Sequence, residues 1–221
     1  MMKSLVILLF SLIISTVFAQ CNVAAFEDSL FKVYYKTKIV SENAKYSLTF
    51  SKDKKGVLKH IKSDTHLRTF RGNFIFNTVK FSRDNKYIAS GSWGKFAQLW
   101  ETNTARYIRT FKGHESWITA IEFSNDSKFL ATGSQDFTAK LWDVSDGTEL
   151  HHFIGHSSFI TSVSFSPNGK YLMTQAWDGS CKLWEIQSAE EKETYFYTDM
   201  VTFSGSTDKY SIQIQQKKAE N

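Results

Sequence analysis

Histidine and cysteine are the side chains of this sequence best suited to bind a metal ion or to act as a base or nucleophile, and the chain has six His and two Cys. His151 and His152 form the only adjacent pair of histidines. In a β-strand their rings would point to opposite faces of the sheet, so they would not share one metal ion. Two cysteines are too few for a zinc cage, which needs about four Cys or His ligands. We therefore expect no metal ion and no cofactor.

Catalytic motifs are also missing from the sequence. The chain has neither a Gly-rich phosphate-binding loop nor a Ser-centred nucleophile elbow, and His60 and His66 are isolated. The sequence thus favours a protein that is not an enzyme. A hydrolase whose site is assembled from distant loops is the alternative, because sequence motifs do not detect such a site.

The composition is that of a globular, aromatic-rich chain. Of its 221 residues, 42% are hydrophobic and 15% are aromatic, with one Pro and 11 Gly. The length allows one large domain or two small ones, and the composition excludes collagen-like and low-complexity chains. The 27 Lys and Arg outnumber the 22 Asp and Glu, but they are spread along the chain rather than clustered. We therefore expect no nucleic-acid partner, while an anionic surface such as a lipid or polysaccharide stays open.

The first twenty residues are typical of a secretory signal peptide. Lys3 precedes an apolar run over residues 5–17, which is too short to span a bilayer. Cleavage after Ala19 or Gln20 would give a secreted or extracytoplasmic protein with no stable membrane insertion. The alternatives are an uncleaved anchor and a lipoprotein acylated at Cys21, and the long side chain of Gln20 disfavours the lipoprotein.

An internal repeat is the most informative feature of the sequence. Trp100, Trp142 and Trp184 follow one another at intervals of 42 residues, each preceded by Leu and followed by Glu or Asp. A further copy lies upstream, where residues 40–46 match the second unit at an offset of 41. Residues 201–210 match the start of a fifth copy. A repeat of this length is typical of propellers and solenoids.

Each repeat unit is predicted to form short β-strands. Apolar residues alternate over residues 117–123, and the polar residues 125–127 form a turn after them. Three more strands are expected over residues 129–132, 138–142 and 149–153. Four short antiparallel strands per unit are typical of a propeller blade, whose sheet must stack on its neighbours to bury both faces.

The sequence therefore predicts an all-β protein, a β-propeller of four full four-stranded blades plus a partial fifth. The expected boundaries are a signal peptide at 1–20, an N-terminal extension at 21–30, blades at about 31–69, 70–111, 112–153 and 154–195, a partial blade at 196–214 and a polar tail at 215–221. In the partial blade, strands are expected over residues 200–203 and 209–214. Propellers usually close with about four to eight blades, and here the last blade lacks its outer pair of strands. The count therefore favours an incomplete, open ring or a homo-oligomer that completes it.

Gly-His pairs stand before two of the repeated tryptophans. They are Gly113-His114 before Trp142-Asp143 and Gly155-His156 before Trp184-Glu185. With these motifs in register, residues 31–214 resemble the WD-repeat (WD40) β-propeller family. The resemblance implies a hydrogen-bonded network inside a blade, formed by His114, Thr132, Asp136 and Trp142 in the third unit and by His156, Thr174, Asp178 and Trp184 in the fourth. Its role is structural, because a buried indole N–H and a buried imidazole must be hydrogen-bonded.

The second unit departs from this pattern. Asn73 stands where the family has His, and Gly94 replaces the aspartate of the turn. Only Ser90 and Trp100 of the four positions are kept, so we expect no network in this unit. The first unit lacks the tryptophan altogether.

The resemblance also implies a surface for partners. In this family the turns between the second and third strands share one face of the propeller with the loops that contain Gly-His. On this top face we expect Trp93, Gln135 and Trp177 from the turns and Trp117 and Phe159 from the loops. Exposed aromatic side chains bind partners well because they bury a large area at little cost in entropy. The alternative is that these rings, Trp117 and Phe159 ahead of Trp93 and Trp177, pack down onto adjacent loops.

The function predicted from the sequence is thus a non-catalytic scaffold that binds a protein or peptide partner through an aromatic-rich face. A secreted propeller hydrolase and a binder of polysaccharides or anionic surfaces are the alternatives. Cys181 aligns with Ala97 and Ala139, which predicts a small buried core residue, and a disulfide with Cys21 is the alternative for it.

Overall fold

The structure, a computed structural model, describes residues 38–51, 54–72, 76–196, 200–206 and 209–215. The chain divides into two units, and all described residues belong to the second, Lys38–Asn221. The expected signal peptide, the N-terminal extension, the start of the first blade, Asn73 and the polar tail from residue 216 lie outside the described residues. In the described part of the chain, no helix is long and apolar enough to cross a membrane.

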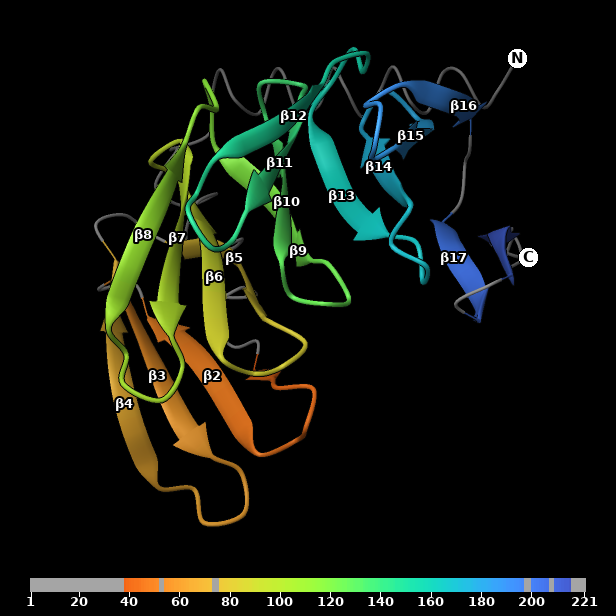
Figure 1. The fold of residues 1–221 in the computed structure, drawn as a ribbon. Coiled ribbons are helices and arrows are strands. Elements are labelled where there is room, and N and C mark those ends of the chain that lie inside the picture. Colours follow the sequence, from red (N-terminus) through yellow and green to blue (C-terminus); the bar gives the residue numbers. More distant parts are fainter. Residues whose placement is uncertain (1–37, 52–53, 73–75, 197–199, 207–208, 216–221) are drawn as a thin grey trace, which may run out of the picture. The chain divides into compact units, whose positions relative to one another are not determined.

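The described residues form antiparallel sheets, four with four strands and one with two (Figure 1). The first sheet contains β1 (Ile39–Val40), β2 (Tyr46–Ser51), β3 (Lys55–His60) and β4 (His66–Arg71). The second contains β5 (Phe76–Phe81), β6 (Tyr87–Ser92), β7 (Phe96–Glu101) and β8 (Tyr107–Lys112). The third contains β9 (Ile118–Phe123), β10 (Phe129–Ser134), β11 (Ala139–Asp143) and β12 (Glu149–Phe153). The fourth contains β13 (Ile160–Phe165), β14 (Tyr171–Ala176), β15 (Ser180–Glu185) and β16 (Glu191–Phe196), and the last contains β17 (Met200–Ser206) and β18 (Lys209–Gln215).

This topology confirms the predicted fold. In every four-stranded sheet, consecutive strands are neighbours, which is the arrangement of a propeller blade. The strand expected over residues 149–153 coincides with β12, and the two strands expected in the partial blade are found as β17 and β18. The described residues thus form a partial propeller, and we refer to the four-stranded sheets as the first to fourth blades.

The backbone of the turns repeats from blade to blade. In each blade, one residue with positive φ lies in each of the three turns between strands. Between the first and second strands these residues are Ala44, Asn85, Ser127 and Gly169. Between the second and third strands they are Lys54, Lys95, Phe137 and Gly179. Between the third and fourth strands they are Asp64, Ala105, Gly147 and Ala189. The first blade therefore shares the turns of the other blades although it lacks their tryptophan.

Side-chain hydrogen bonds explain why the first turn of each blade forms. In the third blade, Ser124 Oγ donates to Asp126 Oδ1 at 2.6 Å, and the backbone N–H of Lys128 donates to the same oxygen at 3.1 Å. The backbone N–H of Phe129 donates to Ser124 Oγ at 2.9 Å. The other three blades have the same bonds from a serine and an Asp or Asn. Short polar side chains of this kind favour turns because they replace backbone partners locally.

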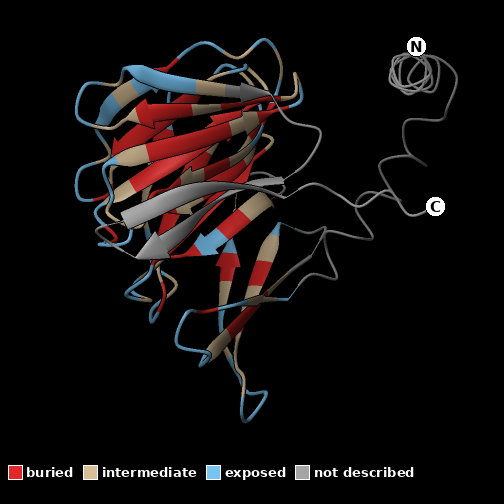
Figure 2. Ribbon diagram, turned by 90° about the vertical axis from the view of Figure 1, so that its right-hand side faces the viewer, coloured by how far each residue is buried: buried red, intermediate tan, exposed pale blue. Residues whose placement is uncertain are grey.

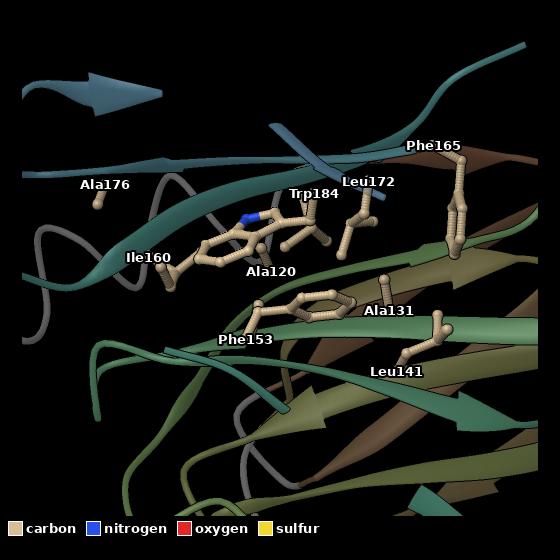
Figure 3. Packing of buried hydrophobic residues seen from close by; sticks show 11 residues of the cluster. Ala120, Ala131, Leu141, Phe153, Ile160, Phe165, Leu172, Ala176 and Trp184 are labelled. Atoms are coloured by element: carbon tan, nitrogen blue, oxygen red, sulfur yellow. The ribbon is translucent and has the colours of Figure 1, made fainter. Parts of the chain in front are cut away.

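The core consists of hydrophobic clusters between neighbouring blades. Between the third and fourth blades, Leu141 and Phe153 face Ile160, Leu172 and Trp184 (Figure 3). Two further clusters join the second blade to the third and the first blade to the second. Figure 2 shows the buried residues running along the strands, with exposed residues in the turns and loops and on parts of the strands, as on the outer strands β4 and β12. Each blade is therefore stabilised by its neighbours, and its polar connections are left for the surface.

Two glycines set how closely neighbouring blades approach each other. A Cβ atom on Gly91 would lie 2.4 Å from Cγ2 of Ile118, and a Cβ atom on Gly133 would lie 2.4 Å from Cγ2 of Ile160. A side chain at either position would force the next blade to move. In the fourth blade, Gln175 stands at the equivalent position.

Cys181 lies in β15 and is fully buried. Burial raises the pKa of its thiol to about 12, so the side chain stays protonated and packs as an apolar group. This is the core position expected from its alignment with Ala97 and Ala139, which are also buried.

Candidate interaction surface

In the third blade, four side chains form a hydrogen-bonded chain. Trp142 Nε1 donates to Thr132 Oγ1 at 2.8 Å, and Thr132 Oγ1 lies 2.8 Å from His114 Nε2. His114 Nδ1 lies 2.7 Å from Asp136 Oδ2. One arrangement of protons satisfies every contact, in which the threonine hydroxyl donates to Nε2 and Nδ1–H donates to the carboxylate. The structure thus brings together the four residues that the family resemblance implies.

Asp136 links this network to the surface loops. Its Oδ2 also accepts a hydrogen bond from the backbone N–H of Glu115 at 2.9 Å, and its Oδ1 accepts one from the backbone N–H of Thr138 at 3.0 Å. Burial raises the pKa of Asp136, but hydrogen bonds from His114, Thr138 and Glu115 hold the pKa well below its usual range. The ionised carboxylate therefore joins the loop before β9 to the turn between β10 and β11.

The network of the fourth blade differs in one link. His156 Nε2 lies 2.7 Å from Thr174 Oγ1, which accepts a hydrogen bond from Trp184 Nε1 at 2.8 Å. His156 Nδ1 lies 2.7 Å from Ser180 Oγ but 3.5 Å from Asp178 Oδ2. Ser180 Oγ in turn donates to Asp178 Oδ1 at 2.5 Å. Ser180, which the family resemblance does not imply, thus connects the imidazole to the carboxylate.

The second blade is stabilised differently at these positions. Ser90 Oγ is buried and has no hydrogen-bond partner in the structure. Trp100 is 2% exposed and packs edge-on against Phe70 and Phe76, with ring centroids 6.2 Å and 5.6 Å apart. Apolar packing therefore stabilises this tryptophan, where a polar network stabilises those of the third and fourth blades.

Six residues in the turns and loops of the second, third and fourth blades form a continuous row, which we call the aromatic row. They are Trp93, Trp117, Gln135, Phe137, Phe159 and Trp177. The rings of Trp93 and Trp117 stack with centroids 4.5 Å apart and an interplanar angle of 3°. The backbone N–H of Gln135 donates to the carbonyl oxygen of Trp117 at 2.9 Å. These contacts join the turn of the second blade to the loop and turn of the third.

The row continues from the third blade to the fourth. Phe137 lies two residues after Gln135, and its ring contacts that of Phe159 with centroids 5.6 Å apart. The backbone N–H of Trp177 donates to the carbonyl oxygen of Phe159 at 2.9 Å. The five residues expected on the top face therefore lie in one row, and Phe137, which was not predicted, connects its two halves.

The aromatic row exposes a large apolar surface. Trp177 is 67% exposed, Phe137 and Phe159 are each 41% exposed, and Trp117 is 37% exposed. Ile154, in the loop before β13, is 67% exposed. The four rings of the row, together with Ile154 outside it, are most of the exposed large hydrophobic side chains among the described residues. Trp117 and Phe159 thus pack against neighbouring turns and still present part of their rings to solvent, as aromatic hot-spot residues do.

Phe137 occupies a strained backbone position. Its φ of 73° lies in the left-handed region, which a bulky residue rarely adopts and which costs about 1–2 kcal/mol. The equivalent residue of the fourth blade is Gly179, with a φ of 78°. A residue that strains its turn while exposing its ring is a candidate for a role in binding.

The described histidines offer no reactive cluster. His151 and His152 pair with Leu141 and Lys140 on β11, so their side chains lie on opposite faces of the sheet. Both ring nitrogens of His114 and of His156 are engaged in the blade networks. Among the described residues, no group of three or more His, Cys, Asp or Glu is placed to hold a metal ion.

Four-stranded blades with repeated His–Thr–Trp networks define a WD-repeat β-propeller. The family described as WD domain, G-beta repeat matches residues 64–101, 105–143 and 147–185, and the chain belongs to this family. Each match runs from the outer strand of one blade through the third strand of the next, as from β8 to β11 for residues 105–143. Members of the family are usually non-catalytic and typically act as protein-interaction scaffolds.

Among solved structures, the chain is similar to U3-55K, with a TM-score of 0.65 and 20% sequence identity. The similarity covers 72% of this chain and 50% of the U3-55K chain, so the chain spans about half the length of that protein. This likeness supports the fold alone. No curated protein sequence matches the chain significantly.

Proposed function

We propose that this chain is a non-catalytic scaffold that binds a protein or peptide partner through the aromatic row. The observation that carries the proposal is the exposure of four rings, those of Trp117, Phe137, Phe159 and Trp177, within one connected row. Aromatic side chains bury a large area on binding and lose little conformational entropy. The typical role of WD40 domains agrees with this proposal.

The blade networks support the proposal because they hold the turns that carry the rings. Phe137 directly follows Asp136, and Trp177 directly precedes Asp178. Both carboxylates accept hydrogen bonds from the backbone of a neighbouring loop, at 2.9 Å from Glu115 and 2.7 Å from Ser157. A surface that is rigid before binding loses less entropy on binding than a mobile one.

Replacing Trp177 with alanine tests the proposal. Tagged wild-type chain and the Trp177→Ala variant are incubated with an extract of the source cells, and captured proteins are quantified by mass spectrometry. A hot-spot aromatic residue contributes about 2 kcal/mol or more, so capture of the partner is expected to fall about thirtyfold. The matched control is Leu150→Ala, because Leu150 is 39% exposed but lies on β12, outside the row.

The proposal predicts partners that Leu150→Ala retains and Trp177→Ala loses, with equal unfolding temperatures for all three proteins. If no captured protein depends on Trp177, the aromatic row is not the binding surface. Turnover on a panel of ester and phosphate substrates would instead support the alternative of a hydrolase.

A further inference from the structure

The two halves of the aromatic row differ in how much ring surface they offer. Trp93 and Trp117 stack face to face at 4.5 Å, so each ring covers one face of the other. Phe137 and Phe159 touch at a tilt of 41° and each remains 41% exposed. Trp177 is 67% exposed. The half formed by Phe137, Phe159 and Trp177, which we call the open half, therefore has the larger free aromatic surface.

The charges around the two halves also differ. The residues of the open half lie in the turns 135–137 and 177–179 and in the loop 154–159. These segments contain two carboxylates, Asp136 and Asp178, and no Lys or Arg. The other half, formed by Trp93 and Trp117, has Lys95 in its turn, Lys112 at the end of β8 and Glu115 in the loop, all exposed, so its two positive charges outnumber its one negative charge. The open half is thus the negatively charged end of the row.

Both carboxylates of the open half stay ionised. Burial raises the pKa of Asp178, but hydrogen bonds from Ser180 and from the backbone N–H of Ser157 lower it to about 2. The pKa of Asp136 is likewise held below its usual range. The side chains of these two residues remain 11% and 13% exposed, so their charge reaches the surface.

The cations packed beneath the loops do not cancel this charge. Lys182 lies under Gly155, and its Nζ is 2.9 Å from both carboxylate oxygens of Glu191. Lys140 lies under Gly113 and is paired with Glu149 at 2.7 Å. Each of these two lysines is therefore neutralised by its own glutamate, and neither of them forms an ion pair with Asp136 or Asp178.

From this arrangement we propose that the open half binds an arginine side chain of the partner, carried on a peptide segment that lies along the aromatic row. This inference rests on the proposed function and names the chemistry that the site would recognise. A guanidinium group stacks on an aromatic face, most favourably on that of Trp, and is attracted by nearby carboxylates. A partner segment rich in acidic residues would instead be repelled by Asp136 and Asp178.

The test selects peptides without assuming the rest of their sequence. A random dodecapeptide display library is selected against the wild-type chain, with the Trp177→Ala variant used to remove peptides that bind elsewhere. Enriched peptides are synthesised with a fluorescent label, and their affinity is measured by anisotropy. We expect arginine to be enriched, and replacement of that arginine by glutamine to weaken binding about tenfold.

A charge change at Gln135 provides an independent readout. Gln135 lies in the row between Trp117 and Phe137, and it is not part of a blade network. Gln135→Lys is expected to weaken the selected peptides and Gln135→Glu to strengthen them, each about threefold at low salt and less at high salt. Leu150→Ala is the control and is expected to leave their affinity unchanged.

The outcomes separate this inference from the function on which it rests. Peptides that need Trp177 but contain no arginine, or contain mainly acidic residues, would overturn the arginine inference and leave the proposed function standing. Equal affinity for Gln135→Lys and Gln135→Glu would also overturn the inference. If no enriched peptide depends on Trp177, both proposals are wrong.

Discussion

Replacing Thr132 with valine removes the hydroxyl that joins Trp142 to His114 in the third blade. Valine has nearly the same volume, so the apolar packing around the position is kept. Trp142 Nε1 and His114 Nε2, each 2.8 Å from the hydroxyl, lose this partner inside the blade. Leaving a buried polar group unpaired costs about 1–3 kcal/mol, so the free energy of unfolding is expected to fall by about 2–6 kcal/mol.

The second blade provides a matched control for this substitution. Ser90 occupies the position of Thr132, but its buried Oγ has no hydrogen-bond partner. Ser90→Ala is therefore expected to change the free energy of unfolding by less than about 1 kcal/mol. Urea unfolding followed by circular dichroism measures both variants beside the wild type. A loss below about 1 kcal/mol for Thr132→Val, or an equal loss for Ser90→Ala, would refute the role given to the network.

Two further perturbations test the packing and the buried histidine. Gly133→Ala places a Cβ atom 2.4 Å from Cγ2 of Ile160 and is expected to lower stability by about 1–3 kcal/mol, measured by urea unfolding. Gly169→Ala meets no atom within 4 Å, so its smaller loss, from its φ of 69°, is the control. Burial lowers the pKa of His156 in the folded chain from 6.5. As the pH falls, the imidazole is therefore protonated in the unfolded chain at a higher pH than in the folded chain. The contribution of His156 to stability is therefore expected to be full above pH 6.5 and to decrease below it. A urea midpoint of unfolding that stays constant between pH 7.5 and 5.5 would contradict this role of the buried histidine.

The repeat explains why so much of the fold was predictable from the sequence. The constant interval between Trp100, Trp142 and Trp184 aligns the second, third and fourth units without gaps, so alternation in one of them predicts the strands in the other two. The residues of the His114 network occur at fixed places in this alignment, and in the structure they lie within hydrogen-bonding distance. Periodicity therefore carries the information about which residues share a position.

The features that the sequence did not reveal depend on local geometry within a turn. Ser180 and Thr138 share a position, yet Ser180 Oγ lies 2.7 Å from His156 Nδ1 and Thr138 Oγ1 lies 3.4 Å from His114 Nδ1. The nearer partner of Nδ1 is thus the hydroxyl in the fourth blade and the carboxylate, at 2.7 Å, in the third. Phe137 was not predicted because the position shared by Trp93 and Trp177 falls on Gln135, two residues earlier. The signal was a bulky residue where the fourth unit has Gly179, which marks a turn that needs positive φ.

The close contact between Gly133 and Ile160 determines where a duplicated blade fits among the four blades. A second copy of residues 112–153 placed after Phe153 would bring its own Ile118 against Gly133, and its own glycine against Ile160, so both new junctions repeat an existing fit. A copy of residues 154–195 placed after the fourth blade would instead set an isoleucine against Gln175, where the space left by glycine is filled. A duplicated blade thus fits after the third blade and is opposed after the fourth, so these otherwise similar units are not equivalent as sites of duplication.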